Sequence, residues 1–194
     1  MSEVAALILA AGRSTRMGSN KMLIVLDGKP LVQHVVETAL ASKANPVFVI
    51  TGHQAELVEA ALHGFKVIFV HNANYASGLS SSLICGVKAL RNHTAGVIVL
   101  LGDMPRISLA SVNALVDAFE ANPDKLAVVP VIGGERGNPV LLSRFMFKDI
   151  AQLKGDKGAR TLIDEAGMDV LELSLNDLFL LLDADTPEMI KSLL

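Results

Sequence analysis

Short, continuously apolar runs that alternate with helical patterns constrain the fold of this chain most strongly. Five such runs have the length of a β-strand, and they span residues 4–9, 47–50, 67–70, 97–101 and 127–131. Strands that are apolar on both faces are typical of parallel sheets covered by helices. The sequence therefore predicts a three-layer α/β fold whose mostly parallel sheet has helices on both faces. Its most apolar run, 97–101, is expected to be a central strand.

Helical spacing and capping residues predict the connections between these strands. Pro30 is expected in the first turn of a helix that carries Leu31, Val35 and Val36 on one face. Three more helices are expected: one at residues 55–62, one capped by the serines at 80–82, and one running from Ser108 to about residue 121. Short connections of this kind indicate a doubly covered sheet of the Rossmann type.

The pattern changes after residue 132. Turn-forming residues at 133–139 are followed by an apolar run at 140–142, a helical stretch near 145–153 and a glycine-rich loop at 154–160. We then expect a helix to about residue 166 and strands at 170–173 and 179–182. A last helix is expected to begin at residues 186–188. No linker divides the chain. We therefore expect a single domain, 1–194, in which residues 133–175 form a small antiparallel insertion on the substrate side.

Composition excludes several classes of function. The 194 residues carry a net charge of −3 and only 4% aromatic residues, which argues against nucleic-acid binding. The single cysteine, Cys85, excludes an internal disulfide, and the five histidines have no metal-ligand spacing. No signal-peptide pattern and no apolar run of membrane-spanning length are visible, so we expect a cytoplasmic protein without a membrane partner.

Ligands of parallel α/β sheets bind beyond the carboxyl ends of the strands. That rule selects the loops at residues 10–21, 51–54, 71–82 and 102–106. In the first of them, three residues with almost no side chain, Ala10, Ala11 and Gly12, precede three cations, Arg13, Arg16 and Lys21. Small residues allow a ligand close to the backbone, and clustered cations suit a polyphosphate. The loop therefore predicts a nucleotide site.

This first loop matches neither common glycine-rich fingerprint. Five residues separate Gly12 from Gly18, where the P-loop has four, and Lys21 is followed by methionine instead of serine or threonine. The dinucleotide pattern G-x-G-x-x-G is also absent, which disfavours an oxidoreductase. The remaining alternative is a surface turn with solvated cations.

Carboxylates after two apolar runs could hold a metal ion. Asp103 follows the most apolar run, and Asp183 and Asp185 follow the run at 179–182. Magnesium is usually bound by one or two carboxylates together with substrate phosphates. The alternative for each aspartate is that it caps a turn or a helix. The serines Ser80 and Ser81, at an expected helix N-terminus, could receive an anion or simply cap the helix.

Six sequence blocks resemble the nucleotidyltransferases of molybdenum cofactor biosynthesis, and the cytidylyltransferase branch in particular. They occur in that family's order and cover nearly the whole chain: 9–21 with 29–31, 78–83, 102–105, 136–139, 155–160 and 183–188. The first block is shared with many sugar-nucleotide and lipid-precursor nucleotidyltransferases, whereas the full set is more specific. The resemblance implies a nucleotidyltransferase fold.

The implied reaction is Mg²⁺-dependent and joins CTP to the phosphate of the pterin-bound molybdenum cofactor, with release of pyrophosphate. Lys21, Arg16 and Asp103 would be catalytic, with the cations holding the triphosphate. Ala10, Ala11 and Gly12 would border the base and ribose. Together with the loop argument, the expected nucleotide-binding residues are Leu9, Ala10, Ala11, Gly12, Arg13, Ser14, Lys21, Gly52, Ser80, Ser81 and Gly102.

The resemblance also implies an acceptor side and a metal. The expected acceptor-binding residues are Arg136, Gly137, Asn138, Pro139, Gly158 and Arg160. Asp103 would bind Mg²⁺, with Asp185 or Asp183 as the second ligand. Guanylyl-transferring relatives tend to carry glycine where this chain has Ala11, which favours CTP. A molybdoenzyme or its chaperone would be the further partner.

Two other functions are compatible with the sequence. One keeps the chemistry but changes the substrates: a guanylyltransferase, or a related enzyme that acts on another phosphorylated acceptor. The other is a nucleotide-binding regulator without turnover.

Overall fold

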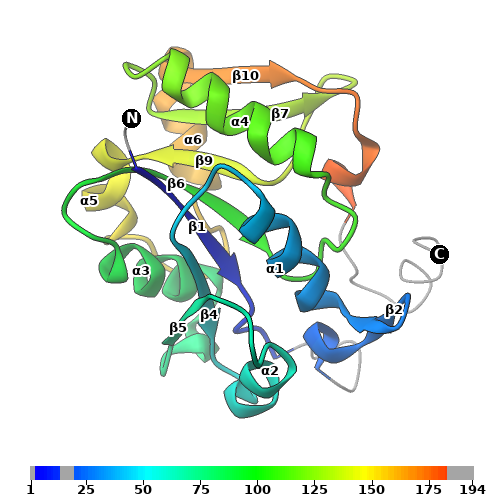
Figure 1. Ribbon diagram of the computed structural model, residues 1–194. Coiled ribbons are helices and arrows are strands. Elements are labelled where there is room, and N and C mark those ends of the chain that lie inside the picture. The colour runs from blue at the N-terminus through cyan, green and yellow to red at the C-terminus, as the bar shows by residue number, and fades with distance from the viewer. Residues whose placement is uncertain (1–2, 14–19, 183–194) are drawn as a thin grey trace.

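The computed structural model describes residues 3–13 and 20–182 of the chain. Its main feature is an eight-stranded sheet, accompanied by a separate two-stranded sheet (Figure 1). In spatial order the strands of the main sheet are β10 (Val170–Ser174), β7 (Ala127–Ile132), β9 (Val140–Ser143), β6 (Thr94–Leu101), β1 (Glu3–Leu9), β4 (Val47–Thr51) and β5 (Ile68–His71), with β8 (Glu135–Arg136) paired to β7. The small sheet joins β2 (Val25–Leu26) to β3 (Lys29–Pro30) through the turn at Asp27 and Gly28.

Six α-helices and several 3-10 turns connect the described strands. The α-helices are α1 (Leu31–Ala41), α2 (Ala55–Ala61), α3 (Leu79–Ala89), α4 (Leu109–Ala121), α5 (Phe147–Ile150) and α6 (Arg160–Ala166). The 3-10 turns are η1 (Lys21–Leu23), η2 (Tyr75–Ser77), η3 (Arg144–Met146), η4 (Gly167–Asp169) and η5 (Leu178–Leu181). None of these helices has the length and apolar character needed to cross a membrane.

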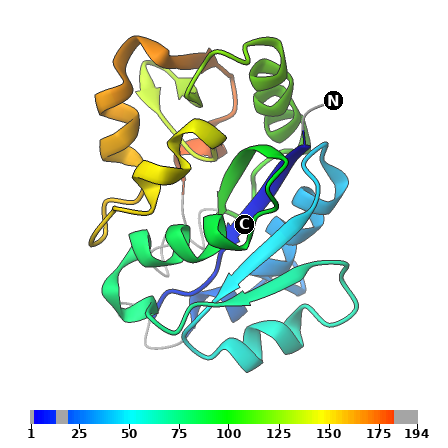
Figure 2. The same cartoon turned by 90° about the vertical axis from the view of Figure 1, so that its left-hand side faces the viewer.

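Two hydrophobic cores lie on opposite faces of the sheet, because successive strand residues point to opposite sides. In β1, Ala6 and Ile8 join the core under α1, α2 and α4. Ala5 and Leu7 join the second core, under α3, α5 and α6. Figures 1 and 2 show these two helical layers on either side of the sheet. The expected three-layer architecture is confirmed.

Strand direction confirms the expectation of a mostly parallel sheet. β1 is parallel to both β4 and β6, and β10 is parallel to β7. β9 runs antiparallel to β6 on one side and to β7 on the other. Residues 133–175 therefore contribute β8, β9 and β10 to the main sheet itself, and β9 joins its two halves.

Two local expectations are wrong. Residues 179–182 do not form a strand: the Asp177 carboxylate accepts a hydrogen bond from the Phe179 N–H at 3.2 Å and starts the turn η5, which buries Leu180 in the core. Helix α3 is not capped by a serine. Gly78 is its N-cap residue, with φ of 99°, and it has no side chain with which to cap the helix.

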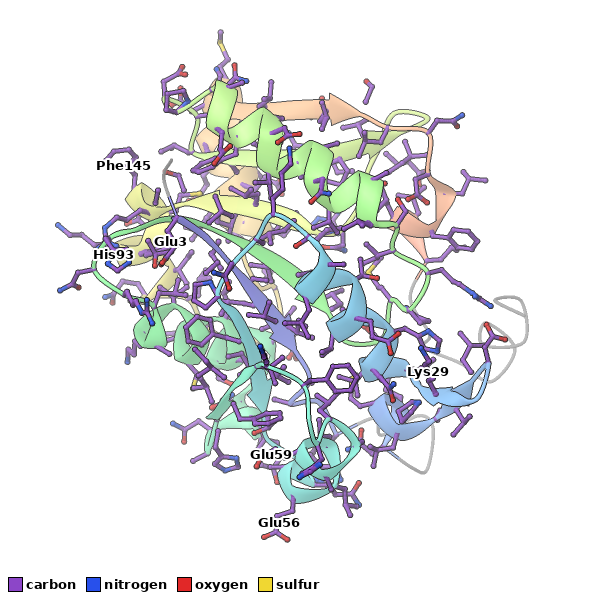
Figure 3. The ribbon with its side chains drawn as sticks, viewed as in Figure 1. Glu3, Lys29, Glu56, Glu59, His93 and Phe145 are labelled. Carbon is purple, nitrogen blue, oxygen red and sulfur yellow. The ribbon has the colours of Figure 1, made fainter. Side chains whose placement is uncertain are left out.

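Polar side chains link the amino ends of β1 and β6, at the end of the sheet opposite the loops after β1, β4, β5 and β6. Glu3 accepts hydrogen bonds from the Thr94 hydroxyl at 2.6 Å and pairs with the His93 ring at 3.1 Å (Figure 3). The Thr94 hydroxyl lowers the pKa of Glu3 below its ordinary value.

On α1, hydrogen bonds from Lys29 lower the pKa of Glu37 in the same way.

Candidate functional site

The carboxyl ends of four strands meet at one edge of the sheet. Leu9 lies beside Leu101 and Ile50 in the two neighbouring strands, and Thr51 lies beside His71. The chain leaves all four strands there, so the loops after β1, β4, β5 and β6 are neighbours (Figures 1 and 2). This register supports the expectation that these loops build one site.

Backbone hydrogen bonds hold the start of the first loop against the strands beside it. The Ala10 N–H donates to the Ile50 carbonyl at 3.0 Å, and the Gly102 N–H donates to the Leu9 carbonyl at 3.0 Å. The His53 N–H donates to the Ala11 carbonyl at 3.2 Å. Ala10 and Ala11 are both buried by this arrangement. The loop therefore begins from a fixed position rather than as a free surface turn.

Tyr75 packs against this loop and is not among the residues expected from the sequence. A Cβ on Gly52 would lie 2.7 Å from the Tyr75 Cβ and 2.8 Å from the Ala11 Cβ, so only glycine lets these groups meet. The Arg13 Cζ lies 5.4 Å from the centroid of the Tyr75 ring, within the range of a cation–π interaction. Tyr75 is the only tyrosine of the chain and lies in a loop at the sheet edge, which is the signal that could have found it.

Lys21 and Asp103 form an ion pair across the site. Asn20 caps the turn η1 by accepting from the Met22 N–H at 3.1 Å, and its amide reaches the His53 carbonyl at 3.4 Å. This cap orients Lys21, whose ammonium group contacts the Asp103 carboxylate. Both side chains are largely buried, at 17% and 9% exposure. A carboxylate in such a place needs a cation beside it.

A cavity of about 390 Å³ opens above this pair. Of the expected nucleotide-binding residues, its wall contains Leu9, Ala11, Gly12, Arg13 and Lys21, together with Asp103. Tyr75, Ser82 and Asp156 complete its polar lining. We call it the nucleotide cavity. Ala10, Gly52, Ser80, Ser81 and Gly102 are absent from its wall, while Ser14, Arg16, Asp183 and Asp185 lie outside the described residues.

The backbone N–H groups at the start of α3 are already used inside the protein. The Leu79 N–H donates to the Asp156 carboxylate at 3.2 Å, and the Ser80 N–H donates to the Gly155 carbonyl at 3.0 Å. The Ser81 hydroxyl donates to the Gly78 carbonyl at 2.8 Å and accepts from the Asn72 amide at 2.9 Å. The N–H groups of Leu79 and Ser80 are therefore occupied by the loop at residues 154–160, and a role of Ser80 and Ser81 in nucleotide binding stays a prediction.

A second cavity, of about 250 Å³, adjoins the first and shares Leu9, Leu79 and Leu101 with it. We call it the acceptor cavity. The expected acceptor residues in its wall are Arg136, Gly137, Asn138, Gly158 and Arg160, and Pro139 is not among them. Arg136 is held by Glu172 at 2.8 Å and Asp164 at 2.9 Å, so part of its charge is already balanced.

No group of three or more His, Cys, Asp or Glu side chains converges on a metal position within residues 3–13 and 20–182. Among the described residues of the nucleotide cavity, Asp103 alone offers a buried carboxylate, and a cation already lies beside it. Such a donor fits a magnesium ion that takes its other ligands from substrate phosphates. The described donors therefore suit a metal that arrives with a nucleotide.

Cys85 has no part in this site. Its thiol contacts the His71 carbonyl at 3.7 Å on the side of α3, and burial raises its pKa above the ordinary value. A thiol that stays protonated is a poor nucleophile.

Comparison with known proteins decides the family. The family model of the MobA-like NTP transferase domain matches residues 6–171. The chain belongs to this family. The purine catabolism protein PucB of Bacillus subtilis is 34% identical over 189 residues, which are 93% of this chain and 90% of PucB. The bifunctional protein GlmU of Geotalea uraniireducens is 33% identical over 141 residues, 72% of this chain and only 30% of GlmU. The chain thus spans less than a third of that relative's length.

Solved structures share the whole fold. Rv0371c of Mycobacterium tuberculosis H37Rv superposes with a TM-score of 0.86 at 27% identity, over 100% of this chain and 97% of that one. A second structure of Rv0371c, in complex with manganese, has a TM-score of 0.82 at 25% identity and covers 100% of this chain and 98% of that one. Family and fold are therefore those of the MobA-like NTP transferase domain.

Proposed function

We propose that this protein transfers CMP from CTP to the phosphate of the molybdenum cofactor and releases pyrophosphate. The observation that carries the proposal is the pair of adjoining cavities. One has the cations and the carboxylate that a nucleoside triphosphate needs, and the other is bordered by the two sequence blocks that resemble the acceptor loops of molybdenum cofactor cytidylyltransferases. Residues 133–175 are then the acceptor side of one domain.

In this proposal an oxygen of the acceptor phosphate attacks the α-phosphorus of CTP. A new phosphorus–oxygen bond forms there while the bond to the β-phosphate oxygen breaks, so pyrophosphate leaves. Lys21 and Arg13 neutralise the charge that develops on the leaving group. Arg16, outside the described residues, would add to them. The reaction needs positioning and charge neutralisation instead of a covalent enzyme intermediate.

Asp103 is the described residue that would hold Mg²⁺, and Asp183 or Asp185 would provide the second ligand. The metal would supply positive charge that stabilises the negative charge of the substrate phosphates. Manganese in the Rv0371c complex supports the presence of a divalent-cation site in a protein of this fold.

Ala11 supports the choice of CTP. It lies in the wall of the nucleotide cavity at 3% exposure, and its methyl group lies beside Gly52. Glycine at this position, as guanylyl-transferring relatives tend to have, would leave more room and a freer backbone beside the base.

Pyrophosphate release with molybdopterin acceptor, Mg²⁺ and each of CTP, GTP, ATP and UTP tests the proposal. We expect release with CTP at a rate far above the others. Equal or faster release with GTP would replace it with a guanylyltransferase. Calorimetric binding of CTP without turnover on any phosphorylated acceptor would indicate a nucleotide-binding regulator.

A further inference from the structure

We propose that Asp156 is a positioning residue that fastens the loop at residues 154–160, here called the acceptor loop, onto the start of α3. This inference rests on the proposed function for the identity of the two cavities. It assigns a role to a residue that lies outside the set expected from sequence.

The acceptor loop and α3 are joined by two hydrogen bonds. The Asp156 carboxylate accepts from the Leu79 N–H at 3.2 Å, and the Gly155 carbonyl accepts from the Ser80 N–H at 3.0 Å. A carboxylate near the first N–H groups of a helix is also favoured by the helix dipole. Gly78 provides no side-chain cap, so Asp156 caps the helix from 77 residues away.

Gly78 is shaped for this contact. A Cβ at Gly78 would lie 2.4 Å from the Asp156 Oδ1 and 2.7 Å from the Gly155 carbonyl group. Its φ of 99° is a conformation that other residues rarely adopt. Glycine therefore both turns the chain into α3 and leaves the space that the acceptor loop fills.

The contact lies between the two cavities. Asp156 lines the nucleotide cavity, whereas Lys157, Gly158 and Arg160, the residues just after it, line the acceptor cavity. Leu79, whose N–H binds Asp156, lines both. A Cβ at Gly158 would come 3.0 Å from the Leu79 side chain, so the loop also packs closely there. Releasing Asp156 would therefore displace the wall of the acceptor cavity and leave the ion pair of the nucleotide cavity in place.

Two readouts test the role of Asp156. The first is the rate at which trypsin cuts the folded protein after Lys154 and Lys157, which reports opening of the acceptor loop without any substrate. The second is the steady-state KM for the acceptor, measured beside the KM for CTP and kcat. In Asp156→Ala we expect cleavage and the acceptor KM each to rise about three- to tenfold, the range for one lost hydrogen bond. Because Asp156 also lines the nucleotide cavity, the KM for CTP should rise as well, but by less than the acceptor KM.

Three further variants make the test specific. Asp156→Asn keeps an acceptor oxygen and should restore most of the wild-type behaviour. Gly78→Ala pushes the loop away from the other side and should reproduce Asp156→Ala. Asp149→Ala, an exposed aspartate of α5 outside both cavities, is the matched control and should behave as wild type.

The proposal is overturned if Asp156→Ala leaves tryptic cleavage and the acceptor KM as in wild type, or if Asp156→Asn is as impaired as Asp156→Ala. Failure of the proposed function would look different. Wild type would then turn over no molybdopterin, while the tryptic cleavage rates would still decide whether Asp156 holds the loop.

Discussion

The ammonium group of Lys21 contacts the carboxylate of Asp103, although the two residues are 82 positions apart in the chain. One comes from the turn after the first loop, and the other follows the central strand β6. Because β1 and β6 are neighbours in register, both side chains reach the same cavity. Asp103 is suited to bind a metal ion and Lys21 to bind phosphates, and the two side chains are in direct contact in the protein without ligands.

Replacing Asp103 with asparagine should abolish nucleotidyl transfer without unfolding the protein. The amide keeps the size of the carboxylate but loses the charge that would hold the metal. We expect kcat to fall by at least about 10²-fold. Asp117→Asn is the matched control, since Asp117 pairs with Lys43 at the surface. Thermal melting of both variants separates a loss of chemistry from a loss of structure, and near-normal turnover of Asp103→Asn would refute the metal assignment.

Replacing Lys21 with methionine should raise the affinity of the nucleotide-free protein for Mn²⁺. The lysine neutralises Asp103, so a divalent ion must displace it to bind there. We expect a gain of about tenfold, which is about 1.4 kcal/mol, by calorimetry with MnCl₂ alone. With CTP and acceptor present, the same variant should have a much lower kcat. Lys21→Arg keeps the charge and should bind Mn²⁺ as weakly as wild type, and an unchanged affinity in Lys21→Met would rule out this competition.

Removing the ring of Tyr75 should weaken nucleotide binding through Arg13. A cation–π contact of this kind contributes about 0.5–1 kcal/mol, so Tyr75→Leu should raise the KM for CTP roughly two- to fivefold at constant kcat. Tyr75→Phe keeps the ring and should match wild type. Phe145→Leu, at an aromatic residue with 73% exposure outside both cavities, is the control for general effects. A fall in kcat with no change in KM would argue that Tyr75 acts on chemistry.

Removing the Thr94 hydroxyl should cost stability in a pH-dependent way. The hydroxyl lowers the pKa of Glu3, so its stabilisation is fully present above the ordinary glutamate pKa. It is lost as the pH falls through the lowered pKa of the folded protein. Thr94→Val should therefore lower the free energy of unfolding by about 1 kcal/mol at neutral pH and by less in acid. Urea titrations at about pH 7 and about pH 3, with Thr161→Val as control, measure the difference; an equal loss at both would exclude Glu3 as the cause.

The sequence was most informative where structure follows from local pattern. The apolar runs and their helical connections predict the parallel half of the sheet, and strand ends place Lys21 and Asp103 at one edge. The positions of Gly12 and Arg13 in the nucleotide cavity are predictable for the same reason, since both residues come just after β1. These predictions need only neighbouring residues and the rule that parallel strands share an edge for ligands.

Longer-range contacts were less predictable. The cap of α3 comes from Asp156, and no local signal in the serines 80–82 reveals that a distant carboxylate replaces them. Tyr75 gains its place only because Gly52 leaves room for it. The run at 179–182 has a strand composition, yet the capping carboxylate of Asp177 turns it into η5. In each case a partner remote in sequence, or a competing hydrogen bond, determines the outcome.

Because β9 lies between β7 and β6 but follows both in the chain, the middle of the sheet forms late during synthesis. β6 emerges early and pairs with β1, but its other edge waits for residues 140–143, and β7 reaches the sheet only through the same strand. A nascent chain that ends before residue 140 would expose an apolar, unpaired edge of β6. A chain that ends just before β9 should therefore be much less soluble than one that ends just after it, because only the longer chain can cover the free edge of β6.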